Sequence, residues 1–355
     1  MADICVKAGK HVFQMIQEGT FSFDGVTTFV GPGAGPRWLI ASGFDLTFLK
    51  QEVLGAARPV HLVGTSAGAL RFAAWAQPEY EKSYHALMDS YISMVFSRRD
   101  NRRSVMRSIA GLIDDYVEDD ALPFALANRR YRLAIITARA RNLVKSETAL
   151  LQGVGLGATF LFNLIHPSLV NRFFQRVVFH NSAIPPSFCL DGAFRGRAVP
   201  LNQINFKHVL MATSAIPMVA SGVRDIYGAE TGVYRDGGLT DYQLNHQYAG
   251  SPDDIILFFN HQERIVPAWM DKHLFYRTPP ARYLENILMI YPSVEFVEKL
   301  PGGKVPDRGD FRLYMKDPKG RMRNWRKAVA MTRHFGEEFL ELAASGRLRR
   351  IVEKL

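Results

Sequence analysis

The sequence predicts an α/β fold with a mostly parallel central sheet, because short apolar strands alternate with glycine turns and helices near its start. Residues 26–30 are β-branched and aromatic, and a glycine-rich turn and an apolar helical stretch at 38–49 follow them. The pattern recurs at residues 60–63, which precede a second turn and a helical stretch at 69–76. Two consecutive strand–turn–helix units indicate parallel strands joined by crossover helices.

Further elements follow along the chain in an order that extends this sheet. Their hydrophobic periodicity predicts helices at residues 80–96, 104–116 and 206–214, strands at 131–137 and 255–259, a short strand ending at Tyr234, and an amphipathic terminal helix at 324–342. No linker clearly divides the chain into domains. One domain that carries insertions is therefore the expected organisation.

Composition and charge exclude several protein classes. The chain has 355 residues, of which 47% are hydrophobic and 22% charged, so it can bury a core and does not resemble a disordered protein. Lys and Arg number 44 against 34 Asp and Glu, and the net charge of +10 favours encounters with anionic surfaces such as phospholipid head groups or nucleic acid, without choosing between them. No Cys or Cys/His spacing suits zinc and no RNA-binding signature is present, so neither a metal nor a nucleic-acid partner is expected.

Cysteine usage and the first residues predict a cytoplasmic protein. Cys5 and Cys189 are the only cysteines, which is too few for a disulfide framework. Residues 1–19 mix charged and apolar side chains and leave no uninterrupted hydrophobic region for secretion. We therefore expect a cytoplasmic location, with peripheral contact at an anionic membrane as the association that the net charge would favour.

Residues 149–165 form the most hydrophobic window of the chain. Gln152 and Asn163 interrupt the window, and its length barely reaches the minimum for spanning a bilayer, so a transmembrane helix is not expected. Glycines at 153, 155 and 157 also weaken a helix. Two interpretations stay open: a buried helical hairpin in the core, or a mobile segment that is a flap over the substrate or a membrane-docking surface.

The residues Gly64-Thr65-Ser66-Ala67-Gly68 form a Gly-x-Ser-x-Gly pentapeptide between a short strand and a helix. Such a turn needs small residues on both sides because it is sharp, and it lifts the serine hydroxyl to the N-terminus of the helix, where developing negative charge is favoured. The flanking strand and helix favour this interpretation over a chance turn. Ser66 is therefore the candidate nucleophile.

A serine hydroxyl needs a base, and the sequence offers two kinds. Hydrolases commonly use a histidine oriented by a carboxylate. The histidines after Ser66 include His180, His208, His246, His261, His273 and His334, but none lies in a recognisable small-residue loop. The other solution is a carboxylate that acts directly on the serine. Asp236 suits it because Gly237 and Gly238 follow, at an apparent strand end, although an ordinary turn would have the same composition.

The glycine turn at residues 31–36 is the candidate oxyanion site. It would place the backbone N–H groups of Gly33, Ala34 and Gly35 at a second helix N-terminus, beside Ser66 if the two strands are neighbours. An ordinary strand-to-helix turn is the alternative interpretation.

Taken in this order, the three motifs resemble the patatin-like phospholipase family. That family places a glycine-rich oxyanion loop first, a Gly-x-Ser-x-Gly turn next and Asp-Gly-Gly or Asp-Gly-Ala far downstream. Residues 212–217, Ala-Thr-Ser-Ala-Ile-Pro, also resemble the segment that precedes the family's catalytic aspartate. The resemblance covers about residues 26–245, weakly between 80 and 200.

The resemblance implies a three-layer α/β/α fold and a Ser66–Asp236 dyad without histidine. Backbone amides of Gly33, Ala34 and Gly35 would hold the oxyanion, an acyl-Ser66 intermediate would form and water would hydrolyse it. No metal or organic cofactor is implied. The implied domain arrangement is a patatin-like catalytic domain at residues 20–260 with a helical insertion at about 80–200. A C-terminal extension at 261–355 would pack on the same domain and end in a long helix.

This sequence departs from the family pattern in the glycine loop. Pro32 and Pro36 replace glycines and have no N–H to donate, and Gly35 occupies the usual basic position, for which Arg37 is a candidate replacement. Downstream, Tyr242 and Leu244 stand where family members often have Asn and Pro. These departures leave the dyad intact and leave the substrate class and the catalytic efficiency open.

The sequence therefore predicts a serine acyl hydrolase that cleaves carboxylic ester bonds of lipids, with phospholipid as the favoured substrate. Two alternatives stay open. One is a Ser-His-Asp esterase that uses a downstream histidine, and the other is a catalytically impaired protein that binds lipid or a partner. The oligomeric state is not predicted.

Overall fold

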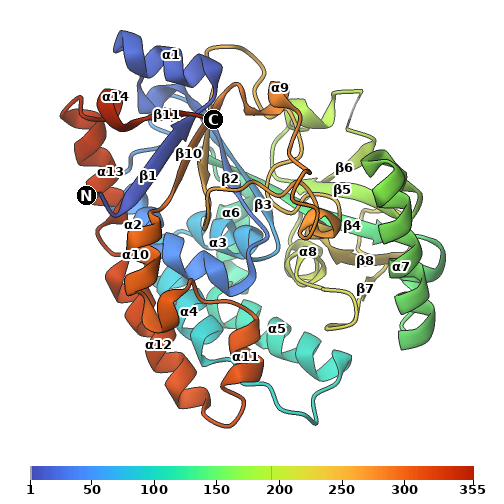
Figure 1. The fold of residues 1–355 in the computed structure, drawn as a ribbon. Coiled ribbons are helices and arrows are strands. Elements are labelled where there is room, and N and C mark those ends of the chain that lie inside the picture. Colours follow the sequence, from blue (N-terminus) through green and yellow to red (C-terminus); the bar gives the residue numbers. More distant parts are fainter. Residues whose placement is uncertain (1, 193) are drawn as a thin grey trace.

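The computed structural model describes residues 2–192 and 194–355, which form one sheet of eleven strands with helices around it (Figure 1). The strands are β1 (Ile4–Ala8), β2 (Val26–Gly31), β3 (Val60–Thr65), β4 (Tyr131–Ala140), β5 (Phe174–His180), β6 (Gly196–Pro200), β7 (Val223–Arg224), β8 (Val233–Asp236), β9 (Ile255–Phe259), β10 (Ile287–Pro292) and β11 (Glu353–Lys354).

The α-helices range from single turns to five turns. They are α1 (Lys10–Glu18), α2 (Ser42–Lys50), α3 (Ala67–Trp75), α4 (Tyr80–Ser93), α5 (Arg102–Tyr116), α6 (Leu122–Ala127), α7 (Ala149–Ile165), α8 (Phe206–Thr213), α9 (Ala281–Leu284), α10 (Val294–Lys299), α11 (Gly309–Leu313), α12 (Pro318–Met331), α13 (Phe335–Ala344) and α14 (Leu348–Ile351).

The sheet is mostly parallel, which confirms the predicted fold class. Its strand order is β11-β1-β10-β9-β2-β3-β4-β5-β6, with β7 and β8 joined beside β4. The pairs β10/β9, β9/β2, β2/β3, β3/β4, β5/β6 and β1/β11 run parallel. The pairs β1/β10, β4/β5, β4/β8 and β7/β8 are antiparallel. The two strands predicted first, β2 and β3, are indeed parallel neighbours.

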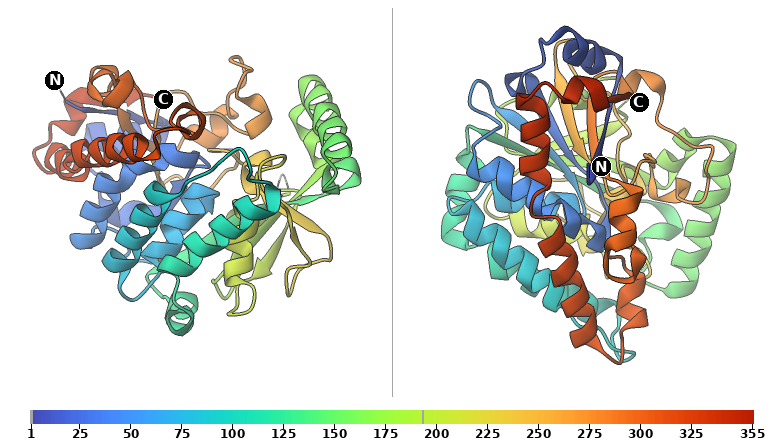
Figure 2. Two further views of the ribbon diagram at one scale, coloured as in Figure 1. Left: turned by 90° about the horizontal axis from the view of Figure 1, so that it is seen from below. Right: turned by 60° about the vertical axis from the view of Figure 1, so that its left-hand side comes forward.

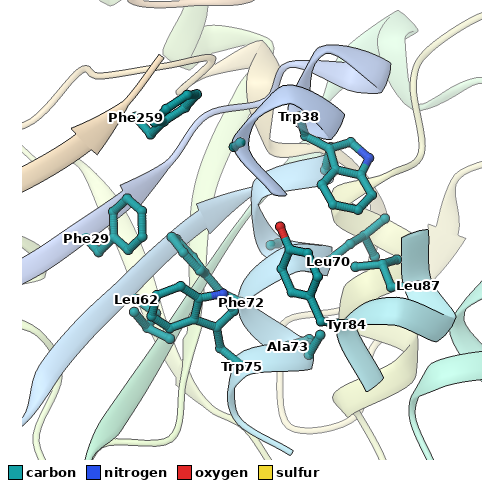
Figure 3. Packing of buried hydrophobic residues seen from close by; sticks show 14 of the residues in the cluster. Phe29, Trp38, Leu62, Leu70, Phe72, Ala73, Trp75, Tyr84, Leu87 and Phe259 are labelled. Atoms are coloured by element: carbon teal, nitrogen blue, oxygen red, sulfur yellow. The ribbon is translucent and has the colours of Figure 1, made fainter. Parts of the chain in front are cut away.

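Alternate residues of the central strands face two separate apolar layers. On one face, Phe29 of β2 meets Phe72 and Trp75 of α3, and Trp38 packs edge-on against Tyr84 of α4 (Figure 3). Helices α2, α3, α4, α12 and α13 cover this face (Figure 2).

The opposite face of the sheet is covered mainly by irregular segments. Val30, Val63 and Ile136 point to this side, because successive residues of a strand face opposite ways. Phe188 and Tyr248, from two long connections, pack against them. At the carboxyl ends of β2 and β3, residues from the last third of the chain line a cleft together with residues that directly follow these two strands.

The register of β4 brings two distant strand ends together. β3 lies beside the first part of β4, and its last residue, Thr65, pairs with Ile136. β8 runs antiparallel to the second part of β4, and its last residue, Asp236, pairs with Thr137. Since β5 occupies the other edge of β4 over this part, β3 and β8 lie on the same edge and end head to head. The residue after Thr65 therefore meets Asp236.

Two expectations about the chain's organisation are wrong. The expected helical insertion at about 80–200 contains β4, β5 and β6, which belong to the central sheet, because β5 pairs with β4 in spite of its polar Gln175 and Arg176. The expected long terminal helix is divided into α12 and α13, and α14 and β11 follow it. A turn at Thr332 separates the two helices and lies so close to Gly43 of α2 that any side chain at position 43 would overlap it.

The hydrophobic window at 149–165 is one continuous helix, α7, and not a helical hairpin. Its buried residues are Gln152, Gly155, Thr159 and Asn163, whereas several leucines of the helix are exposed. The interpretation as buried core is therefore wrong for its apolar face. No described helix has the length and apolar character needed to cross a membrane.

A buried ion pair anchors the helix that follows β3. Arg71 of α3 donates two hydrogen bonds to Asp45 of α2, at 2.7 and 2.6 Å, and the Tyr84 hydroxyl donates to the same carboxylate at 2.5 Å. All three side chains are almost fully buried, and the Arg71 guanidinium also lies over the Phe29 and Phe72 rings. Removing the charge of Asp45 or of Arg71 would leave the other charge buried without its counter-charge.

We predict that Asp45→Asn lowers the free energy of unfolding by about 3 kcal/mol or more, because Arg71 stays buried and loses its counter-charge. Urea unfolding followed by circular dichroism measures the change. The matched control is Asp114→Asn, at an exposed ion pair with Lys207, which is expected to cost less than about 1 kcal/mol. Equal losses in the two variants would contradict the anchoring role.

Candidate active site

Ser66 lies on a strained turn between β3 and α3. Its φ of 53° and ψ of −123° are unusual for a residue with a side chain, and its position is the N-cap of α3. The flanking glycines permit this turn, because a Cβ at Gly64 would lie 2.6 Å from the Ala69 nitrogen and one at Gly68 would lie 2.0 Å from the Gly31 oxygen. The turn thus requires glycine at both positions, as the pentapeptide predicted.

The Ser66 hydroxyl donates a hydrogen bond to Asp236 Oδ2 at 2.9 Å. Both side chains are 8% exposed. The other carboxylate oxygen, Asp236 Oδ1, accepts from the Gly238 N–H at 2.7 Å, and Gly237 lies so close to the Ile136 carbonyl that a Cβ would approach it to 2.2 Å. The structure therefore brings together the two side chains that the motifs singled out.

Thr213 holds the serine turn in place. Its hydroxyl accepts from the Ser66 N–H at 2.8 Å and donates to the Ile136 carbonyl at 2.6 Å. The backbone N–H of Asp236 donates to Ala215 at 3.1 Å. The segment 212–217 therefore contacts both candidate residues, and Thr213 is a positioning residue for Ser66.

Burial raises the pKa of Asp236 above its ordinary value. Hydrogen bonds from Gly238 and from the Ser66 hydroxyl oppose this rise, as do the nearby charges of Arg308 and Lys272. A carboxylate with a raised pKa is a stronger base than an exposed aspartate. The environment of Asp236 thus suits proton transfer from Ser66.

The glycine loop departs from the expected oxyanion site. The Gly33 N–H donates to the Tyr242 carbonyl at 2.6 Å, and the Ala34 N–H donates to the Pro32 carbonyl at 2.9 Å. Both amides are therefore engaged within the protein, which corrects the expectation that they are free to bind an oxyanion. Gly35, with a φ of 58°, is the remaining candidate donor among the three.

A cleft at Ser66 is bordered by three cations. The glycine loop, Ser66 and Asp236 line it together with Ile216, Pro217, Leu239, Tyr242, Trp269, Arg37, Lys272 and Arg308. The Lys272 ammonium lies 4.1 Å from the centroid of the Tyr242 ring, and the Arg308 side chain lies against Gly35. Within the described residues, none of the three cations forms an ion pair with a carboxylate.

Burial and neighbouring positive charge both act on the Lys272 ammonium. Burial lowers its pKa to about 7, and repulsion by Arg308 and Arg37 acts in the same direction, while Asp236 opposes it. Asp236 faces these cations, but its carboxylate already accepts hydrogen bonds from Ser66 and Gly238. Asp307, which interacts with Arg37, is already paired with Lys304. An anion placed in this cleft would neutralise charge that the protein leaves unbalanced.

No histidine lines the cleft among the described residues. His246 lies 3.0 Å from Asp241 and is surrounded by Phe188, Phe194 and Tyr248. Although burial opposes it, the charges of Arg176 and His246 lower the pKa of Asp241 well below its ordinary value. This pair is a buried structural contact outside the Ser66 cleft. The described residues also contain no group of three His, Cys, Asp or Glu placed to hold a metal ion.

Sequence reasoning missed Thr213, Lys272 and Arg308. Thr213 lies inside a segment that the sequence had marked, so that signal existed. Lys272 and Arg308 lie beyond residue 260, in irregular segments where single cations have no recognisable pattern. Their proximity to Ser66 arises only from the fold.

No protein-family model matches this sequence, and no curated protein does. Among solved structures, the chain is similar to human GIVD cytosolic phospholipase A2, with a TM-score of 0.37 and 11% sequence identity. The similarity covers 96% of this chain and 63% of the length of that protein. A likeness at this level assigns neither a family nor an activity.

We predict that Asp236 and Asp241 titrate on opposite sides of the ordinary aspartate pKa of about 3.9. Carboxyl carbon NMR shifts, assigned by substitution of each aspartate, measure both pKa values. Ser66→Ala should raise the pKa of Asp236 further, because it removes a hydrogen bond to the carboxylate, and should not move that of Asp241. An Asp236 pKa at or below the ordinary value would contradict the burial of this group.

Proposed function

We propose that this protein is a serine acyl hydrolase of the patatin-like type, which hydrolyses carboxylic ester bonds of lipids. The observation that carries the proposal is the 2.9 Å hydrogen bond from the Ser66 hydroxyl to Asp236, at the N-terminus of α3 and at the base of a cleft. The strained turn, the raised pKa of Asp236 and the order of the motifs support the same assignment.

The proposed reaction has two steps. Asp236 accepts the Ser66 proton as Oγ attacks the ester carbonyl, and Asp236 then returns that proton to the leaving alcohol as the carbon–oxygen bond breaks. In the second step, Asp236 takes a proton from water, the water oxygen attacks acyl-Ser66, and the proton returns to Ser66 as the fatty acid leaves. Gly35 N–H and the first free amides of α3 are the proposed donors to the oxyanion.

An anionic substrate fits the cleft better than a neutral one. Arg37, Lys272 and Arg308 border the cleft and have no carboxylate partner within the described residues. Guanidinium and ammonium groups bind phosphate oxygens through charge-assisted hydrogen bonds. We therefore propose a phospholipid substrate whose phosphate lies near these three cations.

The two alternative functions receive less support. A Ser-His-Asp esterase needs a histidine beside Ser66, whereas the hydroxyl is bonded to Asp236 and no histidine lines the cleft within the described chain. A catalytically impaired binding protein would be favoured by the engaged Gly33 and Ala34 amides. Ester hydrolysis by the purified protein would exclude the catalytically impaired binding protein.

We predict that Ser66→Ala and Asp236→Asn each lower kcat for hydrolysis of a short-chain phospholipid by at least about 1,000-fold, since the nucleophile or its base is lost. Circular dichroism checks that both variants are folded. His246→Gln and His261→Gln are the matched variants for the histidine mechanism, and each should change kcat by less than about tenfold. Retained turnover in folded Ser66→Ala, or a histidine variant as inactive as Asp236→Asn, would refute the dyad.

Lys272 generates a pH dependence with a defined sign. Its ammonium loses its charge as the pH rises through about 7, so kcat/KM for an anionic phospholipid should fall above that pH. A neutral short-chain ester should not show this decline. Lys272→Met should lower kcat/KM for the anionic substrate below pH 7 and remove the decline, whereas Lys319→Met, at an exposed position, should retain it. An identical profile in Lys272→Met would contradict the role of Lys272.

A further inference from the structure

Helix α7 has its polar side inside and its apolar side outside. No Asp, Glu, Lys or Arg occurs between residues 148 and 171. Gln152, Gly155, Thr159 and Asn163 are buried and recur at helical spacing on the inner side. The opposite side is strongly exposed and apolar: Leu150 is 74%, Val154 54%, Leu161 61% and Ile165 75% exposed. Figure 1 shows α7 at the outer edge of the molecule, beyond β8.

Inner polar contacts fix this unusual orientation. Gln152 donates to the Ser146 carbonyl at 2.8 Å and accepts from the Met218 N–H at 2.8 Å, and Asn163 donates to Asp271 at 2.7 Å. Gly155 packs so closely on Val144 that a Cβ would lie 2.9 Å from its nitrogen. The helix cannot turn its leucines inward without breaking these hydrogen bonds, so the apolar stripe stays on the surface.

The same contacts connect α7 to both walls of the Ser66 cleft. Met218, bonded to Gln152, directly follows Pro217, which lines one wall. Asp271, bonded to Asn163, directly precedes Lys272 in the other wall. If α7 docks on a surface, these contacts would therefore keep the Ser66 cleft close to that surface.

Basic side chains flank α7 along the chain and form no ion pair within the described residues. Arg141 and Lys145 lie just before α7 and Arg172 just after it, and all three are exposed. The one acid between them, Glu147, is bonded to Arg235 at 2.6 Å. The Arg277 guanidinium donates to the carbonyl of Asn163 at the end of the helix. An exposed apolar helix face with exposed basic side chains near both helix ends is complementary to a bilayer with anionic head groups.

We propose that the outer face of α7, formed by Leu150, Val154, Leu161 and Ile165, docks on the surface of an anionic lipid bilayer. The helix would lie in the interface and not cross it, since its 17 residues span only about 25 Å. This inference rests on the proposed function for the reason to approach lipid, but the docking itself requires no catalysis. Exposed Phe275 and Tyr276, beside Arg277, would extend the same surface.

Vesicle co-sedimentation tests the surface directly. All proteins carry Ser66→Ala, so no lipid is hydrolysed, and the vesicles contain equal parts of phosphatidylcholine and phosphatidylserine. Leu150→Gln, Leu161→Gln and Ile165→Gln together should weaken binding by at least about tenfold, because three exposed apolar side chains are removed. The matched control replaces three exposed apolar residues elsewhere, Val95, Val294 and Leu313, and should bind within about twofold of the parent protein.

Each outcome bears on the proposal. If the parent protein binds vesicles of pure phosphatidylcholine more weakly than the mixed vesicles, the basic side chains near α7 contribute to binding. Equal binding by the α7 variant and the control would overturn the proposal, as would a parent protein that binds neither vesicle. A dimer of the parent that the α7 substitutions dissociate, seen by sedimentation velocity, would assign the face to a second copy instead.

The proposed function can fail separately from the docking surface. With Ser66 intact, the α7 variant should hydrolyse a soluble short-chain ester at the parent rate. If no ester is hydrolysed by either protein but vesicle binding still depends on α7, the docking proposal holds and the hydrolase assignment fails.

Discussion

The candidate site depends on one constraint of the sheet: β3 and β8 must end head to head on the same edge of β4. Thr65 pairs with Ile136 and Asp236 with Thr137, so the register leaves the two strand ends one residue apart along β4. A shift of either strand by one residue would send its side chains to the opposite face. The hydrogen bond between Ser66 and Asp236, which are 170 positions apart, is therefore a property of strand pairing as much as of the two side chains.

The surroundings of the dyad stabilise this arrangement and adjust its chemistry. Thr213 connects the Ser66 amide to β4, and the Asp45–Arg71 pair fixes α3, which begins at the serine turn. Burial raises the pKa of Asp236, while the cations of the cleft limit that rise. The same cations supply a positive field for an anionic ester. Under the proposed function, one group of residues would affect both the pKa of Asp236 and the preference for an anionic substrate.

The sequence predicted what short motifs encode and missed what the tertiary fold creates. Ser66, Asp236 and the strands before them follow from local composition, because a sharp turn requires glycines and buried strands require apolar residues. Lys272 and Arg308 reach the cleft through irregular segments without periodicity. The engagement of Gly33 depends on a carbonyl at Tyr242, more than 200 positions away, so no local pattern reveals it. Hydrophobicity left open whether 149–165 is buried core or an exposed flap or docking surface, and the buried Gln152 and Asn163 turn its apolar side outward.

The rate at which a fluorophosphonate labels Ser66, with the site mapped by peptide mass spectrometry, measures whether Asp236 activates the serine hydroxyl. We expect labelling at Ser66 in the native protein and a second-order rate constant at least about 100-fold lower in folded Asp236→Asn, because the serine loses its base. Equal rates in the two proteins, or labelling at another residue, would contradict a nucleophile activated by Asp236.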